Sequence, residues 1–160
     1  MKLTIAAIGK LKSGPEKQLA DDYTKRVAAM GKKAGISGLK ISDWAESQKS
    51  DAAQRMTEEQ AQLWSAVPQG AYVIALDERG LAPSSEIFAA NLRKIMDRSQ
   101  NDIVFMLGGP DGHSAATRQK AHELLAFGAM TWPHRLARLM LLEQIYRSVT
   151  IMLNHPYHRA

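Results

Sequence analysis

The end of the chain carries the densest group of chemically active side chains. Residues 154–159 set two imidazoles, a phenol and a guanidinium beside one another, from Asn154 to Arg159. Such groups transfer protons, stack on bases and bind phosphate. Chain ends usually carry loose, unspecialised sequence. The stretch therefore predicts a catalytic or substrate-binding tail, or alternatively a tail whose Tyr157 and histidines only pack against the body of the domain.

A glycine-rich loop at residues 108–112 is the second candidate. It follows a strongly apolar run, and adjacent glycines let a backbone approach a ligand closely and adopt positive φ. Neither the dinucleotide pattern G-x-G-x-x-G nor the phosphate-binding pattern G-x-x-x-x-G-K-[ST] occurs here. The loop is thus either a tight turn or a site that holds a nucleoside through backbone amides and carbonyls. His113 and His122, in and after the loop, are expected to be surface or capping residues.

The spacing of the tail histidines argues against a metal site. His155 and His158 are three residues apart, but Pro156 disfavours a helix that would point both to one side. A third ligand would have to come from the distant His134 or Glu143. A serine nucleophile in a G-x-S-x-G elbow is also absent. We therefore expect no metal.

Composition limits the remaining classes. A chain of 160 residues that is 45% apolar fits one globular domain spanning residues 1–160. The absence of cysteine excludes disulfides, cysteine-bound metals and thiol nucleophiles, and indicates a cytoplasmic protein. No apolar run reaches the length of a membrane span, so no membrane association is expected. The net charge of +5 is concentrated near both chain ends, which favours an anionic partner such as nucleic acid.

Alternating strand and helix patterns must position these groups. Strands are expected at residues 3–8, 39–41, 71–76, 103–107 and 129–132. Helices are expected around residues 19–30, 56–67, from 85, after 114 and at 136–153. The order predicts a single α/β domain with a mainly parallel, five-stranded sheet. Ligands of such sheets bind beyond the carboxyl ends of strands, so Leu76-Asp77, the 108–112 loop and Thr131-Trp132 should wall one pocket.

The expected first and last helices make further predictions. Leu19, Tyr23, Val27 and Met30 should share the buried face of the first helix. In the helix after residue 114, Ala121, Leu124 and Leu125 should face the sheet. The last helix is apolar on more than one face, whereas a surface helix needs one apolar stripe. It is either wholly buried in the monomer or shared with a second subunit, and we favour the second subunit. In that arrangement an interface or pocket edge would hold Arg138, Glu143, Tyr146 and Arg147.

Taken together, several motifs resemble the RlmH family, ribosomal RNA large-subunit methyltransferases of the SPOUT class that modify N3 of a pseudouridine. The motifs, in order along the full chain, are Leu76-Asp77, Leu107 to Gly112, Met130 to His134, Leu142 to Arg147 and Asn154 to Arg159. The resemblance implies a deep trefoil knot in the carboxyl-terminal half, a homodimer and bound S-adenosylmethionine. By similarity, the cofactor-binding residues are Leu76, Gly108, Phe127, Gly128, Ala129, Met130, Thr131 and Trp132. The family's Gly-Gly-Pro-Glu-Gly has Asp111 in place of glutamate here, which shortens the reach of the carboxylate.

The resemblance also suggests roles for the tail. His158 would act as a base or orient the target base, Tyr157 would stack or hydrogen-bond, and Arg147 or Arg159 would offset negative charge or hold phosphate. The expected partner is ribosomal RNA within the ribosome. A small chain without an appended RNA-binding domain has little surface with which to recognise a long RNA, so a folded ribosomal particle would have to present the target nucleotide. Two rivals stay open: a non-catalytic ribosome-binding module of the same fold, and a metal-dependent hydrolase using His134, His155 and His158.

Overall fold

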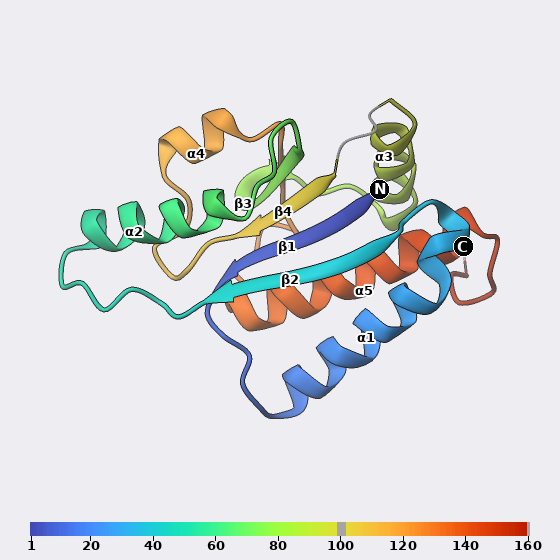
Figure 1. Cartoon of the computed structure of the whole chain (residues 1–160), viewed down its shortest axis with the longest axis horizontal. Helices are drawn as coiled ribbons and strands as arrows, with labels where there is room; N and C mark the ends of the chain where they lie inside the picture. The colour runs from blue at the N-terminus through green and yellow to red at the C-terminus, as the bar shows by residue number, and fades with distance from the viewer. Residues whose placement is uncertain (99–101, 160) are drawn as a thin grey trace.

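A five-stranded parallel sheet forms the centre of the computed structural model, which describes residues 1–98 and 102–159 (Figure 1). The strands lie in the order β2-β1-β4-β3-β5, and every neighbouring pair is parallel. Their bounds are β1 Lys2–Ile8, β2 Gly38–Trp44, β3 Tyr72–Leu81, β4 Ile103–Leu107 and β5 Glu123–Leu125. The predicted single α/β domain with a mainly parallel sheet is confirmed.

Helices cover both faces of the sheet (Figure 1). One face carries α1, α3 and α5, and the other carries α2, with α4 lying beside α2. The bounds are α1 Pro15–Gly31, α2 Ala52–Ser65, α3 Ser85–Arg98, α4 Ala115–Lys120 and α5 His134–Met152, with a short 3-10 helix at Lys32–Ala34. Because both faces are covered, the central strands are apolar on both sides rather than alternating with polar residues. On β1, for example, Ile5 packs toward α1, α3 and α5, while Ala6 packs toward α2.

Local sequence fixes where several helices begin. Pro15 is the first residue of α1, a position at which the backbone N–H has no acceptor within the helix, so the N–H that proline lacks is not needed. The Asp51 side chain caps α2 by accepting a hydrogen bond from the Gln54 amide at 2.9 Å. Ser114 caps α4 through the Thr117 amide at 3.1 Å, as predicted from the sequence.

Two expected elements were wrong. Residues 129–132 are not a strand, and the last strand is instead β5, which pairs with β3 from Ile74–Glu123 onward. Accordingly α4 ends at Lys120, so Leu124 and Leu125 belong to the sheet and not to a helix packed on it. The Tyr72 hydroxyl donates to Glu123 at 2.9 Å across this edge, so the polar first residue of β5 has a partner on β3.

The buried face of α1 is also offset from the predicted one. Leu19 is 43% exposed, whereas the neighbouring Ala20 is buried beside Val27. Adjacent helical residues point about 100° apart, so an error of one residue exchanges a core position for a surface one. Tyr23 and Met30 are only partly buried, and they pack against the margin of the core.

The long helix α5 is buried mainly within its own chain. Leu141, Leu142, Ile145 and Val149 are fully buried between α1, α3 and the sheet. The monomer therefore covers the middle of this helix, and its apolar character does not by itself require a second subunit. Among the helices of the described ranges, none combines enough length and apolar character to cross a bilayer.

A buried arginine, Arg138, links the start of α5 to the sheet. Arg138 is almost fully buried and pairs with Asp43 at 2.8 Å, while also donating to the Gly9 carbonyl. Asp43 and Gly9 lie at the carboxyl ends of β2 and β1. The expectation that Arg138 lies at an interface or pocket edge was wrong, because its partners are inside the chain. The ion pair instead fixes α5 against the edge of the sheet at which the parallel strands end.

The deep trefoil knot stays a prediction, although one close crossing is consistent with it. A Cβ atom at Gly80 would lie 2.5 Å from the carbonyl carbon and oxygen of Leu124. Leu81 then accepts a hydrogen bond from the Ala126 amide at 2.9 Å. The end of β3 and the chain after β5 therefore touch backbone to backbone.

Candidate functional site

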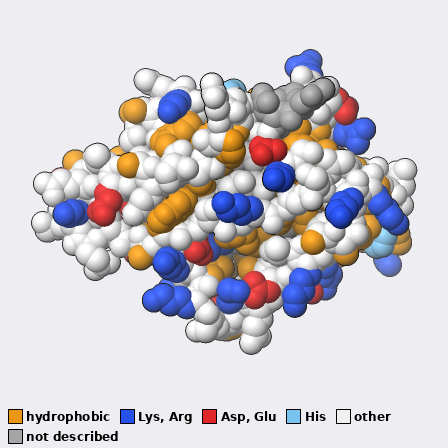
Figure 2. Space-filling view, viewed as in Figure 1, with side chains coloured by type: hydrophobic (Ala, Val, Ile, Leu, Met, Phe, Trp, Pro, Cys, Tyr) orange, Lys and Arg blue, Asp and Glu red, His pale blue; other side chains and the backbone are white. Residues whose placement is uncertain are grey.

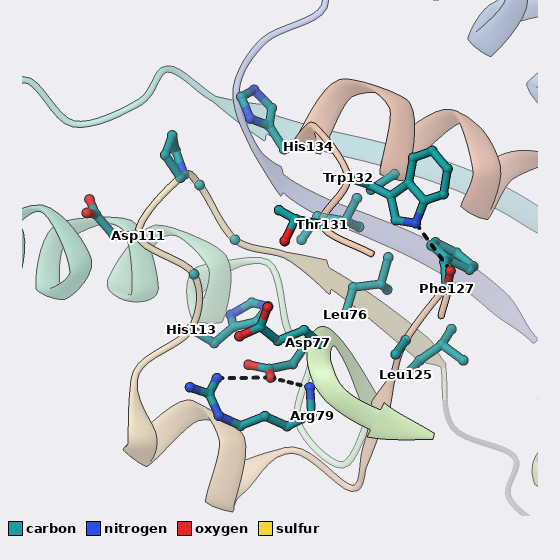
Figure 3. A pocket seen from close by; sticks show the side chains of 18 of the residues that line it. Leu76, Asp77, Arg79, Asp111, His113, Leu125, Phe127, Thr131, Trp132 and His134 are labelled. Carbon is teal, nitrogen blue, oxygen red and sulfur yellow. Dashed lines mark hydrogen bonds and ion pairs between the residues drawn. The ribbon is translucent and has the colours of Figure 1, made fainter. Parts of the chain in front are cut away.

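A pocket of about 890 Å³ lies where β3 and β4 end (Figure 3). Its three main walls are residues 76–79, 107–115 and 125–134. Leu76 and Leu107 are partners in the register of the two strands, so their chains leave the sheet side by side. The prediction that these three segments form one pocket is confirmed.

The glycine loop is closed by its own backbone. The Gly112 amide donates to the Gly109 carbonyl at 2.9 Å, and Gly112 has a φ of +75° that favours glycine. A Cβ atom at Gly108 would lie 3.0 Å from the Gly112 carbonyl group. The loop is therefore a tight turn that also lines the pocket, and its role in holding a nucleoside stays a prediction.

An ion pair ties this loop to α2. Arg55 binds Asp111 through two hydrogen bonds, of 2.8 Å from Nε and 3.1 Å from a terminal nitrogen. Its other terminal nitrogen donates to the carbonyls of Lys49 and Ser50. The Arg55 guanidinium lowers the pKa of Asp111. Asp111 thus has a partner inside the chain and acts on the pocket by holding the loop.

The third wall is a loop that folds on itself. The Trp132 indole donates to the Phe127 carbonyl at 3.2 Å, and Gly128 has a φ of +99°. Every expected cofactor residue lines the pocket except Ala129; the lining residues of that set are Leu76, Gly108, Phe127, Gly128, Met130, Thr131 and Trp132. The side chain of Met130 is 73% exposed, so this wall is apolar and open to solvent.

Charged residues gather at the other end of the pocket (Figure 3). Asp77 Oδ1 accepts hydrogen bonds from the Arg79 amide at 3.0 Å and from its guanidinium at 3.2 Å. Arg118 lies 3.8 Å from Asp77 Oδ2 and donates to the His113 carbonyl.

His113 corrects a prediction, since it is 2% exposed and not a surface residue. Its Nδ1 lies 3.3 Å from the Gln60 side chain, and burial lowers the pKa of the imidazole, which is therefore neutral at pH 7. His122 is an exposed surface residue, as predicted, and its Nδ1 accepts a hydrogen bond from the Val73 amide at 3.0 Å. Neither histidine caps a helix.

Sequence reasoning did not single out Arg79 or Arg118, and it placed His113 at the surface. Two signals in the sequence could have identified the arginines. Arg79 follows the end of the apolar run by three residues, and Arg118 lies one turn into the helix after the glycine loop. Both positions open toward the carboxyl edge of a parallel sheet, where ligands bind.

The tail forms a separate cluster around Tyr157. Its hydroxyl donates to Glu143 at 3.0 Å and lies 3.4 Å from the Tyr23 hydroxyl, while its ring meets Tyr146 edge-on at 4.8 Å. Burial, with contributions from Tyr23 and Glu143, raises the pKa of Tyr157 well above its ordinary value. Tyr157 is thus a protonated hydrogen-bond donor at neutral pH.

His158 and Arg147 belong to the same cluster. Arg147 pairs with Glu143 at 2.5 Å, and this carboxylate raises the pKa of the guanidinium. A second Arg147 nitrogen lies 3.3 Å from His158 Nδ1, and His158 Nε2 lies 2.8 Å from Glu86. Arginine only donates and a carboxylate only accepts, so the pattern fits an imidazole with its proton on Nε2. The three predicted catalytic residues therefore contact one another.

The structure separates this cluster from the pocket. His134, at the start of α5, lines the pocket, whereas Arg147 lies near the opposite end of the helix. At about 1.5 Å per residue, the helix carries Arg147 about 20 Å from His134. Within one chain the predicted catalytic and cofactor residues are thus far apart. The same separation removes His134 from the tail histidines, so the metal-hydrolase rival loses its proposed set of three.

Comparisons with known proteins agree on one family. A family model described as predicted SPOUT methyltransferase matches residues 1–158. The chain is 49% identical to ribosomal RNA large subunit methyltransferase H of Rhodopseudomonas palustris strain HaA2 and 48% identical to the protein of that name from Nitrobacter winogradskyi, covering all of each chain. Among solved structures, a probable methyltransferase from Bordetella pertussis Tohama I aligns with a TM-score of 0.50 at 13% identity, over 92% of this chain and 93% of that one.

Proposed function

Because the chain belongs to the SPOUT methyltransferase family, and within it to the large-subunit ribosomal RNA methyltransferases H, we propose that it methylates N3 of a pseudouridine in large-subunit ribosomal RNA with S-adenosylmethionine. The observation that carries the proposal is the pocket at the ends of β3 and β4. Seven of the eight residues expected to bind the cofactor line it, although they come from three separate segments of the chain.

The pocket suits an adenosine with a charged extension. Leu76, Phe127 and Trp132 offer apolar surface for a flat base, and the glycine loop and the 125–134 segment offer backbone groups for hydrogen bonds. A nucleoside held in this way needs no phosphate-binding motif, in agreement with the absence of one. The charged residues Asp77, Arg79 and Arg118 would face a charged extension rather than a neutral base.

S-adenosylmethionine, when bound, supplies a methyl group on a positively charged sulfur. Transfer of that methyl to N3 of the target would require N3 to lose its proton, so the tail residues are candidates to remove the proton or to offset the charge left on the base. Tyr157 cannot accept that proton at neutral pH, because its raised pKa keeps the phenol protonated. Arg147 is a permanent cation that can offset negative charge on the base or bind phosphate.

His158 is the tail group whose chemistry suits a base. Its acceptor nitrogen faces Arg147 and its other nitrogen faces Glu86. To take a proton from substrate it must exchange these contacts for the target base. Positioning alone also accelerates transfer, so proton removal by solvent is compatible with the proposal.

A homodimer would unite the two halves of the site. One chain holds its tail about 20 Å of helix from its own pocket, so a tail that acts on the substrate must serve the pocket of a second copy. Large apolar side chains are exposed beside the pocket, namely Met130, Trp132 and Leu136. Such surface is commonly covered by a partner.

The substrate class fits the charge of the chain. Figure 2 shows Lys and Arg side chains spread over the face that includes α1, with a few acidic side chains among them. Lys17 and Arg26 pair with neighbouring aspartates on α1, while Lys25, Lys32 and Lys33 are exposed. A surface of this kind attracts the RNA backbone without reading its sequence, so a folded ribosomal particle would supply the specificity.

Transfer of labelled methyl tests the proposal. Purified protein should transfer methyl from labelled S-adenosylmethionine to ribosomes that lack the modification but not to naked ribosomal RNA, and mass mapping should place it on N3 of one pseudouridine. Labelling of another nucleotide would show that the target is not N3 of a pseudouridine. Cofactor binding without any transfer would contradict the catalytic role, and lack of both would favour the non-catalytic ribosome-binding module.

A further inference from the structure

The two ends of the pocket differ in chemistry. The apolar Phe127 and Trp132 lie toward one end of the pocket, whereas Asp77 and Arg79 lie toward the other (Figure 3). Arg118 also lines the pocket and lies 3.8 Å from Asp77 Oδ2. A neutral nucleoside would use the first end alone. The second end must therefore be explained by the fold or by a charged part of the ligand.

Within residues 1–98 and 102–159, the Oδ2 atom of Asp77 accepts no hydrogen bond. Its side chain is 4% exposed, and Oδ1 accepts both hydrogen bonds from Arg79. Oδ2 has Arg118 as its nearest cation, at 3.8 Å, which is beyond hydrogen-bond distance. A carboxylate oxygen accepts two hydrogen bonds, and a buried one left without them is costly.

Arg118 is similarly underused. Its side chain is 25% exposed, and among the described residues the His113 carbonyl is its one hydrogen-bond partner. The guanidinium carries five N–H groups in a planar fork that suits a carboxylate. The contact to His113, together with the capped start of α4, holds this fork at the rim of the pocket.

Asp77 Oδ2 and Arg118 form only a long ion pair of 3.8 Å, and a carboxylate and a guanidinium that keep hydrogen-bonding capacity side by side are complementary to a zwitterion. An α-ammonium group pairs with the carboxylate, and the adjacent α-carboxylate pairs with the guanidinium. We propose that Asp77 and Arg118 bind the α-amino-acid end of S-adenosylmethionine, with the adenosine lying toward Phe127 and Trp132. This inference rests on the proposed function and adds the residues that recognise the charged half of the cofactor.

The competing explanation is purely structural. Asp77 Oδ1 accepts from the Arg79 amide two residues later, which stabilises the turn where β3 bends away from β4. That contact uses Oδ1 and leaves Oδ2 and Arg118 unexplained. A structural role predicts equal losses for every ligand of the pocket, whereas recognition predicts losses only for ligands with an amino-acid end.

Two nucleosides separate these readings. S-adenosylhomocysteine and 5′-methylthioadenosine are both neutral at sulfur, and only the first carries the amino-acid end. Titration calorimetry on the wild-type protein should show S-adenosylhomocysteine binding at least about tenfold more tightly, as expected for charged hydrogen bonds. Arg118→Gln and Asp77→Asn should each weaken its binding about tenfold or more and change 5′-methylthioadenosine by less than about twofold.

Lys120→Gln is the matched control. It removes a positive charge from the same helix, but Lys120 stacks on Trp64 and does not line the pocket. It should leave both affinities unchanged, and circular dichroism should show that all variants are folded. Equal affinity of the wild type for both nucleosides, or equal losses for both in the variants, would overturn the inference while leaving the methyltransferase proposal intact. If the wild-type protein shows no binding of S-adenosylmethionine by calorimetry, the proposed function itself is refuted.

Discussion

The pocket and the tail lie at opposite ends of α5 and are built in different ways. The pocket is formed by backbone turns, and two of its charged residues, Asp77 and Arg118, keep unused hydrogen-bonding groups. In the tail cluster, by contrast, Tyr157 and His158 both have partners in their own chain. The pocket is thus prepared for a ligand, whereas the tail is docked and must change contacts in order to act.

This difference bears on how the two halves could cooperate. A docked tail far from its own pocket is of no catalytic use in a monomer. The tail would acquire a catalytic use if a second copy of the chain placed its own pocket beside it. The following predictions test the two regions separately, beginning with the change that should have the largest effect.

Truncation before Tyr157 removes the tail and leaves the pocket intact. We expect near-normal binding of S-adenosylmethionine and a loss of ribosome methylation of about 100-fold or more, the scale of a lost proton-transfer or positioning group. Calorimetry and methyl transfer measure the two effects. His158→Ala should give a milder form of the same defect. Equal losses of binding and activity would show that the tail supports the pocket instead.

Mixing the truncated protein with a Gly108→Val protein tests whether tail and pocket come from different chains. At a cofactor concentration well below the Kd of the Gly108→Val protein, each homodimer should show little activity, but a heterodimer can combine one intact pocket with one intact tail. Partial recovery of activity after subunit exchange is the expected result. No recovery, with exchange demonstrated by tagged subunits, would mean that both act within one chain.

Gly108→Val alone should damage the pocket and spare the tail. A Cβ atom at Gly108 would already lie 3.0 Å from the Gly112 carbonyl, and valine adds two methyl groups beyond it. Strain of this kind typically costs about 1–3 kcal/mol, so cofactor affinity should fall about tenfold to 100-fold. Calorimetry measures the loss. Wild-type affinity in a folded variant would remove this loop from the site, and Gly38→Val, with no atom within 4 Å of its Cβ position, is the matched control.

Arg55→Gln should have a smaller effect, since it loosens the loop without touching the ligand. Asp111 then loses both of its hydrogen bonds from α2. We expect S-adenosylmethionine to bind about three- to tenfold more weakly, in line with one lost charged contact acting indirectly. Asp111→Glu should retain more affinity than Asp111→Ala if the ion pair matters. Equal affinity of all these variants would show that the loop holds its shape unaided.

The sequence predicted most of this pocket because its walls follow from strand ends. Continuous apolar runs identified β1, β3 and β4, and the rule that ligands bind beyond carboxyl ends brought Leu76 and the 108–112 loop together. It failed at β5, where three residues beginning with Glu123 are too short for a periodic signal. It also missed Arg118 and the partners of Tyr157, because these contacts depend on how helices pack and not on local spacing.

The smallest expected effect distinguishes a docked tail from a loose one. Tyr157→Phe keeps the ring against Tyr146 but removes the hydrogen bond to Glu143. For a partly exposed donor we expect a loss of about 1 kcal/mol, which lowers the melting temperature by about 2–4 °C in a chain of this size. Because the folded chain raises the pKa of Tyr157, its contribution is fully present below the ordinary tyrosine pKa of about 10. Above that pH the unfolded phenol ionises more readily than the folded one, so the contribution falls. The difference in melting temperature between wild type and Tyr157→Phe should therefore be constant from pH 7 to about 9 and shrink above pH 10. A difference of zero at pH 7 would mean that the tail is not held by its own chain, and the contrast between a docked tail and an open pocket would fail.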